Sequence, residues 1–122
     1  MAGLWLGIGA AFGLLGVAAG AFGAHALRAR LSEDLMAVFR TAVEYQFYHV
    51  AALLAVGLLA RQAQGPWLSA SGIAFAFGVL VFSGSLYILA LSGVRAWGAV
   101  TPIGGLALMI GWLCLIVHVA RL

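Results

Sequence analysis

The chain has 122 residues, of which 66% are hydrophobic and 7% charged, and its formal net charge is +3. Soluble domains carry roughly 25% charged residues, so this composition excludes a water-soluble globular protein. The basic residues are all arginines and lie mainly between apolar segments. This distribution is typical of membrane topology, whereas a nucleic-acid-binding protein would have a clustered basic face. We therefore predict an integral membrane protein that binds no nucleic acid.

Four apolar stretches are each long enough to cross a bilayer, whose hydrocarbon core needs about 20 helical residues. The predicted helices cover residues 4–26, 33–60, 67–91 and 102–120. Their short connections predict an all-α integral membrane protein with one domain, residues 1–122, whose four transmembrane helices form an up-down antiparallel bundle. Four crossings place both termini on the same side of the membrane. The arginine counts of the loops leave the absolute orientation open.

Small residues dominate the first segment. Gly9, Gly13, Gly16 and Gly20 follow one another at spacings of three or four residues. This spacing lets helix backbones approach closely in lipid. Two interpretations follow: the glycines pack inside the bundle, or they form a contact face for a homo-oligomer or for a flat ligand. His25 ends this helix near the membrane surface.

The second predicted helix starts at Ser32, whose hydroxyl is expected to cap it, and then becomes unusually polar. Ionisable groups at membrane depth usually face a bundle interior, a water-filled pocket or a ligand. At 100° per residue, most polar side chains of the run from Arg40 to His49 fall on one arc, which we expect to face protein. This arc holds Arg40, Thr41, Glu44, Tyr45, Tyr48 and His49. Gln46 falls off the arc and would need its own partner on a neighbouring helix.

Glu44 and His49 are the side chains on this arc best suited to titrate or to bind a ligand. Glu44 lies about 14 Å into the helix, where it either pairs with Arg40, titrates in a transport path or contacts a ligand. His49 is either a satisfied core histidine, bonded to the Tyr45 hydroxyl, or a haem ligand. No second ligand is level with it. Because no metal-ligand spacing and no nucleophile-base pair is present, the sequence favours neither a metal centre nor an enzyme.

The third and fourth predicted helices each contain a run rich in small and hydroxyl-bearing residues. The serines of Phe82-Ser83-Gly84-Ser85-Leu86-Tyr87 can donate to carbonyls one turn back, and Gly84 is expected to admit a neighbouring helix. In Thr101-Pro102-Ile103-Gly104-Gly105, the first two residues are typical of a helix cap and first turn. The two glycines either pack against a helix or expose amides to a carboxylate, a phosphate or a quinone carbonyl.

Five motifs, in chain order, resemble those of the domain of unknown function 423 family, small bacterial inner-membrane proteins similar to a mitochondrial transmembrane protein. The motifs are Gly20 to His25, Thr41 to His49, Phe82 to Tyr87, Thr101 to Gly105, and Gly111-Trp112. The resemblance covers nearly the whole chain. It implies a four-helix protein of the bacterial inner membrane, without an assigned activity. The family motifs include His25, Tyr45, Gln46, His49, Ser83, Tyr87, Thr101 and Pro102.

The bundle topology predicts one site from these motifs. In an up-down bundle, the motif-bearing helix ends lie toward one membrane face. We therefore predict a polar cavity open toward the first and third connections, with His49 at its floor; a packed polar seam is the alternative. The predicted lining is His25, Arg40, Thr41, Glu44, Tyr45, Gln46, His49, Ser83, Ser85, Tyr87, Thr101, Gly104 and Gly105.

Three functions remain open for this site. The first is that of a non-enzymatic accessory or ligand-binding protein, alone or within a larger membrane complex. The second is that of a small dimeric transporter or channel, in which Glu44 titrates and the glycine stripe of the first helix joins two protomers. The third is a binding site for haem, a quinone or a lipid head group centred on His49.

Overall fold

The computed structural model describes residues 1–122 and contains helices and turns but no strand. In chain order the elements are α1 (Ala2–Val17), the π-helical segment η1 (Ala18–Gly23), α2 (Ala24–Leu27), α3 (Glu33–Ala60), α4 (Pro66–Ser92), the 3-10 helix η2 (Arg95–Ala99) and α5 (Thr101–Ala120). The first three elements form one continuous span, and η2 leads directly into α5. Four helices are therefore long and apolar enough to cross a membrane, which confirms the predicted all-α fold.

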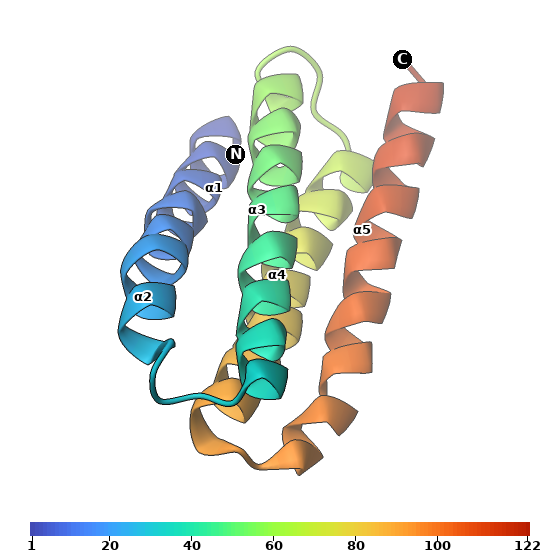
Figure 1. Cartoon of the computed structure of the whole chain (residues 1–122). Helices are drawn as coiled ribbons and strands as arrows, with labels where there is room; N and C mark the ends of the chain where they lie inside the picture. Colours follow the sequence, from blue (N-terminus) through green and yellow to red (C-terminus); the bar gives the residue numbers. More distant parts are fainter.

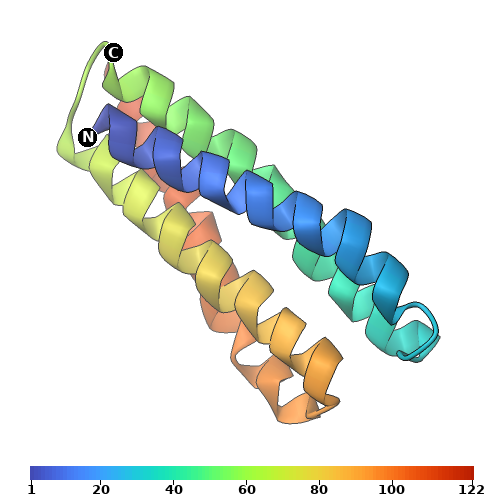
Figure 2. The same ribbon diagram turned by 90° about the vertical axis from the view of Figure 1, so that its left-hand side faces the viewer.

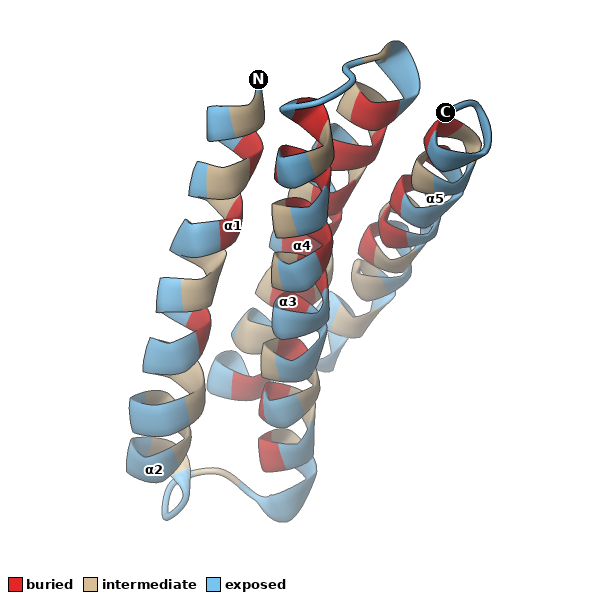
Figure 3. Ribbon diagram, turned by 90° about the horizontal axis from the view of Figure 1, so that it is seen from above, coloured by how far each residue is buried: buried red, intermediate tan, exposed pale blue.

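Successive spans run in opposite directions, and both termini lie at the same end of the bundle (Figure 1). α1 packs mainly on α3, α3 on α4, and α4 on α5. The first and last spans consequently lie on opposite sides of a central α3–α4 pair (Figure 1). Buried residues concentrate on α3 and α4, whereas α1 and α5 expose their outer faces (Figure 3). These outer faces are apolar, as lipid contact requires.

The main hydrophobic core lies in the half of the bundle nearer the termini. Its buried members are Trp5, Ala52, Leu53, Val56, Ala60, Leu68, Phe75, Val79 and Leu108. Toward the other end, the pair formed by the first span and α3 diverges from the pair formed by α4 and α5 (Figure 2). Two grooves open in this diverging half, one on each side of the central pair.

The glycine stripe of the first span packs against α3. A side-chain carbon at Gly9, Gly16 or Gly20 would lie 2.8 to 3.1 Å from the nearest α3 side chain. Such contacts are closer than ordinary van der Waals packing allows, so only glycine fits without movement of α3. Of the two interpretations of the stripe, the structure shows packing within the bundle.

The starts of α3 and α5 differ in how well the sequence predicted them. The Ser32 hydroxyl accepts a hydrogen bond from the Leu35 amide at 3.2 Å, which confirms the predicted cap of α3. Thr101 does not cap α5, because η2 runs into α5 so closely that Val100 takes the cap position and Thr101 is already helical. An exposed ion pair between Arg95 and Asp34, 2.6 Å apart, joins η2 to the start of α3.

Candidate functional site

The inward face of α3 is not the polar arc that the sequence predicted. Gln46 and His49 are buried, whereas Arg40 and Glu44 are exposed, as is His25 at the end of the first span. The prediction that His25, Arg40 and Glu44 line a common cavity is therefore wrong. The face of α3 that turns inward is instead the one whose small and apolar side chains, such as Ala42, pack closely against neighbouring helices.

The predicted ion pair between Arg40 and Glu44 does not form. The ion pair in the structure is that of Arg95 with Asp34 at the bundle end. Glu44 also lines neither of the two grooves in the diverging half. A transport path that runs through one protomer and uses Glu44 therefore has no support in this geometry. Thr41, on the same arc, is half-buried and donates to the Ala37 carbonyl oxygen at 3.0 Å.

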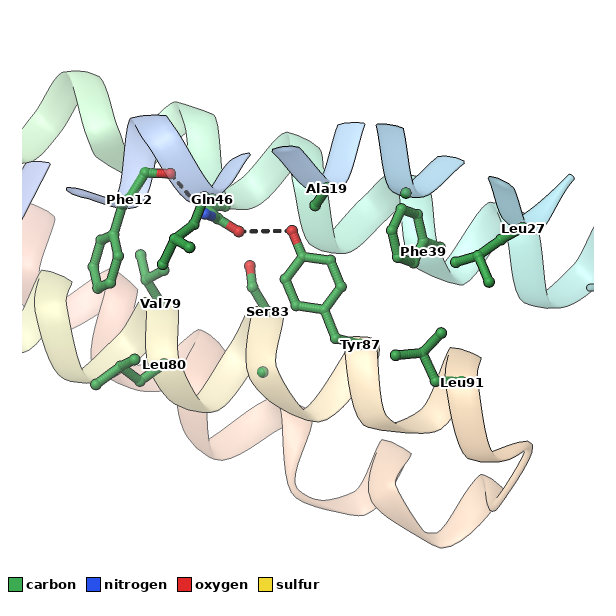
Figure 4. A pocket seen from close by; sticks show the side chains of 13 residues that line it. Phe12, Ala19, Leu27, Phe39, Gln46, Val79, Leu80, Ser83, Tyr87 and Leu91 are labelled. Atoms are coloured by element: carbon green, nitrogen blue, oxygen red, sulfur yellow. Dashed lines mark hydrogen bonds between the residues drawn. The ribbon is translucent and has the colours of Figure 1, made fainter. Parts of the chain in front are cut away.

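Gln46 links α3 to two other helices. Its Nε2 donates to the Phe12 carbonyl oxygen of α1 at 2.7 Å, and its Oε1 accepts from the Tyr87 hydroxyl of α4 at 2.6 Å. Figure 4 shows Gln46 between these two partners. The prediction that Gln46 needs a partner on a neighbouring helix is confirmed. Beside it, the Ser83 hydroxyl donates across to the Ala42 carbonyl oxygen of α3 at 2.7 Å.

These polar groups line a groove between the first span and α4, which we call the α1–α4 groove. Its volume is about 480 Å³. It is lined by Phe12, Leu15, Ala19, Gly23, Leu27, Phe39, Gln46, Val79, Leu80, Ser83, Gly84, Tyr87 and Leu91. Gln46, Ser83 and Tyr87 are already hydrogen-bonded within the protein, so they have protein partners and need none from a ligand. The rest of the groove wall is mainly apolar.

The link between Gln46 and Tyr87 yields a stability prediction. Gln46→Leu should lower the free energy of unfolding by about 1–2 kcal/mol, because it leaves the Tyr87 hydroxyl without a partner. Tyr87→Phe should lower the free energy of unfolding by less than Gln46→Leu does. The loss in the double variant should be smaller than the sum of the two single losses by about 0.5 kcal/mol or more. Reversible unfolding of the four chains in detergent micelles measures these terms. Strictly additive losses would show that the two side chains do not interact.

Both ring nitrogens of His49 are hydrogen-bonded. Nδ1 lies 2.7 Å from the Tyr45 carbonyl oxygen, and Nε2 lies 3.0 Å from Nε1 of Trp112 on α5. A carbonyl accepts and an indole N–H donates, so the two bonds fit a neutral imidazole that carries its proton on Nδ1. The predicted bond with the Tyr45 hydroxyl is replaced by one with the backbone of the same residue. Phe75 packs against the rings of both His49 and Trp112, with centroids 5.6 and 5.0 Å away.

The residues around His49 do not fit a haem. An axial ligand must offer a free nitrogen lone pair, and Nε2 of His49 accepts the Trp112 proton instead. His25 is exposed at one end of the bundle, and His118 lies beside Gly65 at the other. A second histidine is therefore not within reach of the same iron. His49 instead holds the Trp112 ring in place.

A second groove lies between α3 and α5, and we call it the α3–α5 groove. Its volume is about 800 Å³. It is lined by Tyr45, Tyr48, His49, Phe82, Pro102, Gly105, Leu106, Leu108, Met109 and Trp112. The rings of Tyr45 and Tyr48 meet edge to face at 5.4 Å, and Tyr45 also packs on Phe82 at 4.6 Å. Unlike Tyr87, neither tyrosine has a protein partner for its hydroxyl, and their exposed fractions are 38% and 56%.

The remaining predicted site residues serve the contact between α4 and α5. The Ser85 and Thr101 hydroxyl oxygens lie 2.6 Å apart and share a hydrogen bond. Gly104 lies directly against the backbone of Phe82, so its first-turn position packs against a helix and does not face a ligand. Its neighbour Gly105 faces the α3–α5 groove.

The expected role of Gly84 is not found. A side-chain carbon at Gly84 would have no atom within 4 Å, so no helix approaches there. The close approaches on α4 occur instead at Gly72, which the Trp5 ring covers, and at Gly78, which Leu108 covers. The sequence interpretation also missed Trp112 as the partner of His49, although Trp112 belongs to one of the five motifs. The apolar wall formed by Leu106 and Met109 carried no signal that separates it from lipid-facing residues.

The chain matches a family model described as "Protein of unknown function (DUF423)" over residues 19–105. It is 44% identical over 110 residues to UPF0382 membrane protein SERP0230 of Staphylococcus epidermidis, which covers 90% of this chain and 89% of the relative. It is 45% identical over 114 residues to UPF0382 membrane protein SH2409 of Staphylococcus haemolyticus, covering 93% of each.

The name of a third relative includes a location in the cell. UPF0382 inner membrane protein YgdD of Escherichia coli (strain K12) is 40% identical over 110 residues, which is 90% of this chain and 84% of the relative. No solved structure matches the chain. The resemblance drawn from the five motifs is confirmed by these matches.

Proposed function

We propose a ligand-binding function for this chain, which belongs to the DUF423 family of membrane proteins without an assigned activity. In this proposal the chain binds an amphipathic, membrane-soluble molecule in the α3–α5 groove. The proposal rests on two unpartnered phenol hydroxyls, those of Tyr45 and Tyr48, in the wall of a largely apolar groove of about 800 Å³. His49 also lines this groove, but both of its ring nitrogens are hydrogen-bonded within the protein. Small-molecule sites have volumes of roughly 300–1,000 Å³ and combine apolar walls with a few polar groups. The role is non-enzymatic and belongs to the inner membrane, where the name of the E. coli relative places that protein.

The side chains that line the α3–α5 groove define the class of ligand. Tyr45 and Tyr48 can donate to a carbonyl or hydroxyl oxygen, while the faces of Phe82 and Trp112 suit a flat ring. Apolar side chains, among them Met109, continue the groove and suit a hydrocarbon tail. A flat ring that carries a carbonyl or hydroxyl and an apolar tail, such as a quinone, combines these properties. The α1–α4 groove suits such a ligand less well, because its polar groups are already paired.

Molecules that co-purify with the protein test this function. The chain is extracted from its own membrane into lipid nanodiscs, and bound small molecules are identified by mass spectrometry. Met109→Trp places a larger side chain in the groove and should lower the amount of co-purified molecule at least tenfold. Ile73→Trp is the matched control, because Ile73 is exposed on α4 outside both grooves and should retain it.

The tyrosine hydroxyls provide a second comparison in the same experiment. Tyr45→Phe with Tyr48→Phe removes the two donors and keeps the rings, so binding should weaken roughly three- to tenfold per lost hydrogen bond. Recovery of bulk phospholipid alone from every variant would contradict the proposal. A specific molecule that Met109→Trp retains in full would place its site elsewhere.

A further inference from the structure

One stripe of α3 remains uncovered by the other helices along most of its length. Its exposed members are Arg40, Glu44, Tyr48, Ala51, Ala55 and Leu58. They follow one another at spacings of three or four residues and fall within an arc of about 80° on a helix of 100° per residue. A stripe with an average spacing near 3.5 residues is the pattern of a helix that packs along a second helix. We call this stripe the α3 seam.

The two charges of the α3 seam lie inside α3, a helix that is long and apolar enough to cross a membrane. Glu44 lies about 16 Å along the helix axis from Glu33, where α3 begins. Neither Arg40 nor Glu44 forms an ion pair within the chain, whose ion pair is that of Arg95 and Asp34. Ionisable side chains at this depth almost always face protein, water or an opposite charge. A single protomer therefore leaves both groups without the partner that their position requires.

The seam also permits close approach by another helix. Ala51 and Ala55 stand four residues apart and are both exposed, which is the small-residue spacing that allows helix backbones to meet in lipid. In the first span, Gly9, Gly16 and Gly20 are covered by α3 of the same chain, whereas Gly3 and Gly7 are uncovered but stand on a face without charged residues. Exposed small residues and charges of both signs occur together on α3.

We propose that two copies of this chain associate through the α3 seam, with Arg40 of each protomer paired with Glu44 of the other. Copies inserted with the same topology hold equal residues at equal depth, so a twofold axis along the membrane normal runs between the two α3 helices. Arg40 then needs to span four residues, about 6 Å along the axis, to reach the opposite Glu44. The seam carries both signs of charge and is therefore complementary to itself.

Charge reversal in the two positions tests the pairing. Arg40→Glu and Glu44→Arg each place like charges on both sides of the interface, so each variant alone should lose at least tenfold in dimer fraction. Co-expression of the two variants with different tags restores two opposite-charge pairs, and the mixed dimer should recover most of the native level. Dimer fractions are read from single-molecule photobleaching in liposomes. If Arg40 paired with Glu44 within one helix, the mixed dimer would not recover, because each variant carries two like charges on its own helix. Absence of recovery would overturn the proposal.

Disulfide formation on an otherwise native surface gives a second readout that does not depend on the charged variants. In a chain whose buried Cys114 is replaced by Ala, Ala55→Cys should form disulfide-linked dimers when a membrane-permeant oxidant such as iodine is added to the membranes. Ile116→Cys, on the exposed face of α5, is the control and should not. Equal cross-linking at both positions, or a monomeric native chain whose Arg40 binds phospholipid, would refute the interface. None of these substitutions lies in the wall of the α3–α5 groove, so each leaves the lining of that groove unchanged.

Discussion

Gly104→Ala is expected to lower the free energy of unfolding by about 3 kcal/mol, at the upper end of the usual cost of overpacking. A side-chain carbon at this position would overlap the backbone nitrogen of Phe82 and lie within 2.7 Å of its Cα. Backbone atoms inside a helix cannot rotate away as a side chain can. The methyl group therefore forces α5 away from α4 and disturbs the most extensive helix contact of the bundle.

The neighbouring glycine provides the control for this substitution. At Gly105, the nearest atom to a new side-chain carbon belongs to the Phe82 ring, at 3.6 Å, which is an ordinary contact. Since alanine favours a helix over glycine by up to about 1 kcal/mol, Gly105→Ala should leave the stability unchanged or raise it. Unfolding of both variants in detergent micelles measures the difference. Equal effects at the two positions would show that α4 and α5 do not meet at Gly104.

His49→Leu is expected to lower the free energy of unfolding by about 2–3 kcal/mol. The substitution leaves the indole N–H of Trp112 without its acceptor and removes the imidazole from its contact with Phe75. An unpaired donor in a membrane bundle cannot turn to water for a partner, so it retains most of its desolvation cost.

A companion variant separates the hydrogen bond from the loss of packing. Trp112→Phe in the His49→Leu background removes the orphaned N–H, so the double variant should lose clearly less than the sum of the single losses, by about 1 kcal/mol. The same unfolding assay on the four chains measures this coupling. A coupling of zero would mean that His49 and Trp112 stabilise the bundle independently.

The sequence predicted the fold well, because the length of an apolar stretch is a strong constraint in a bilayer. It also predicted the Ser32 cap and the need of Gln46 for partners on other helices, since these depend on hydrogen bonds that must be satisfied. The π-helical segment Ala18–Gly23 carried no recognised signal.

The orientation of α3 could not be predicted in the same way. The angular count assumed that charged side chains turn inward, yet Arg40 and Glu44 lie outside while Ala42 and Gln46 are buried. A second copy of the chain packed on α3 would reconcile the assumption with the structure, because Arg40 and Glu44 would then face protein. The partner of His49 was equally hidden, since Trp112 lies 63 residues further along the chain and nothing local links them.

The divergence of the two helix pairs explains why one predicted cavity became two grooves. Tyr45 and His49 turn toward α5, while Gln46 and Tyr87 turn toward the first span. Neighbouring residues on α3 thus serve opposite sides of the molecule. Only the side with free phenol hydroxyls retains the capacity to recognise a polar group.

Photochemical capture in the native membrane tests the central claim of a ligand in the α3–α5 groove. A photoreactive amino acid is placed at Leu106, in the wall of the groove, or at Ile73, on the lipid-facing surface outside it. After illumination, the mass of the adduct identifies what lay against each position. The groove position should capture one discrete ring-bearing membrane molecule, and Ile73 should capture ordinary phospholipid. The same phospholipid adducts at both positions would contradict the claim.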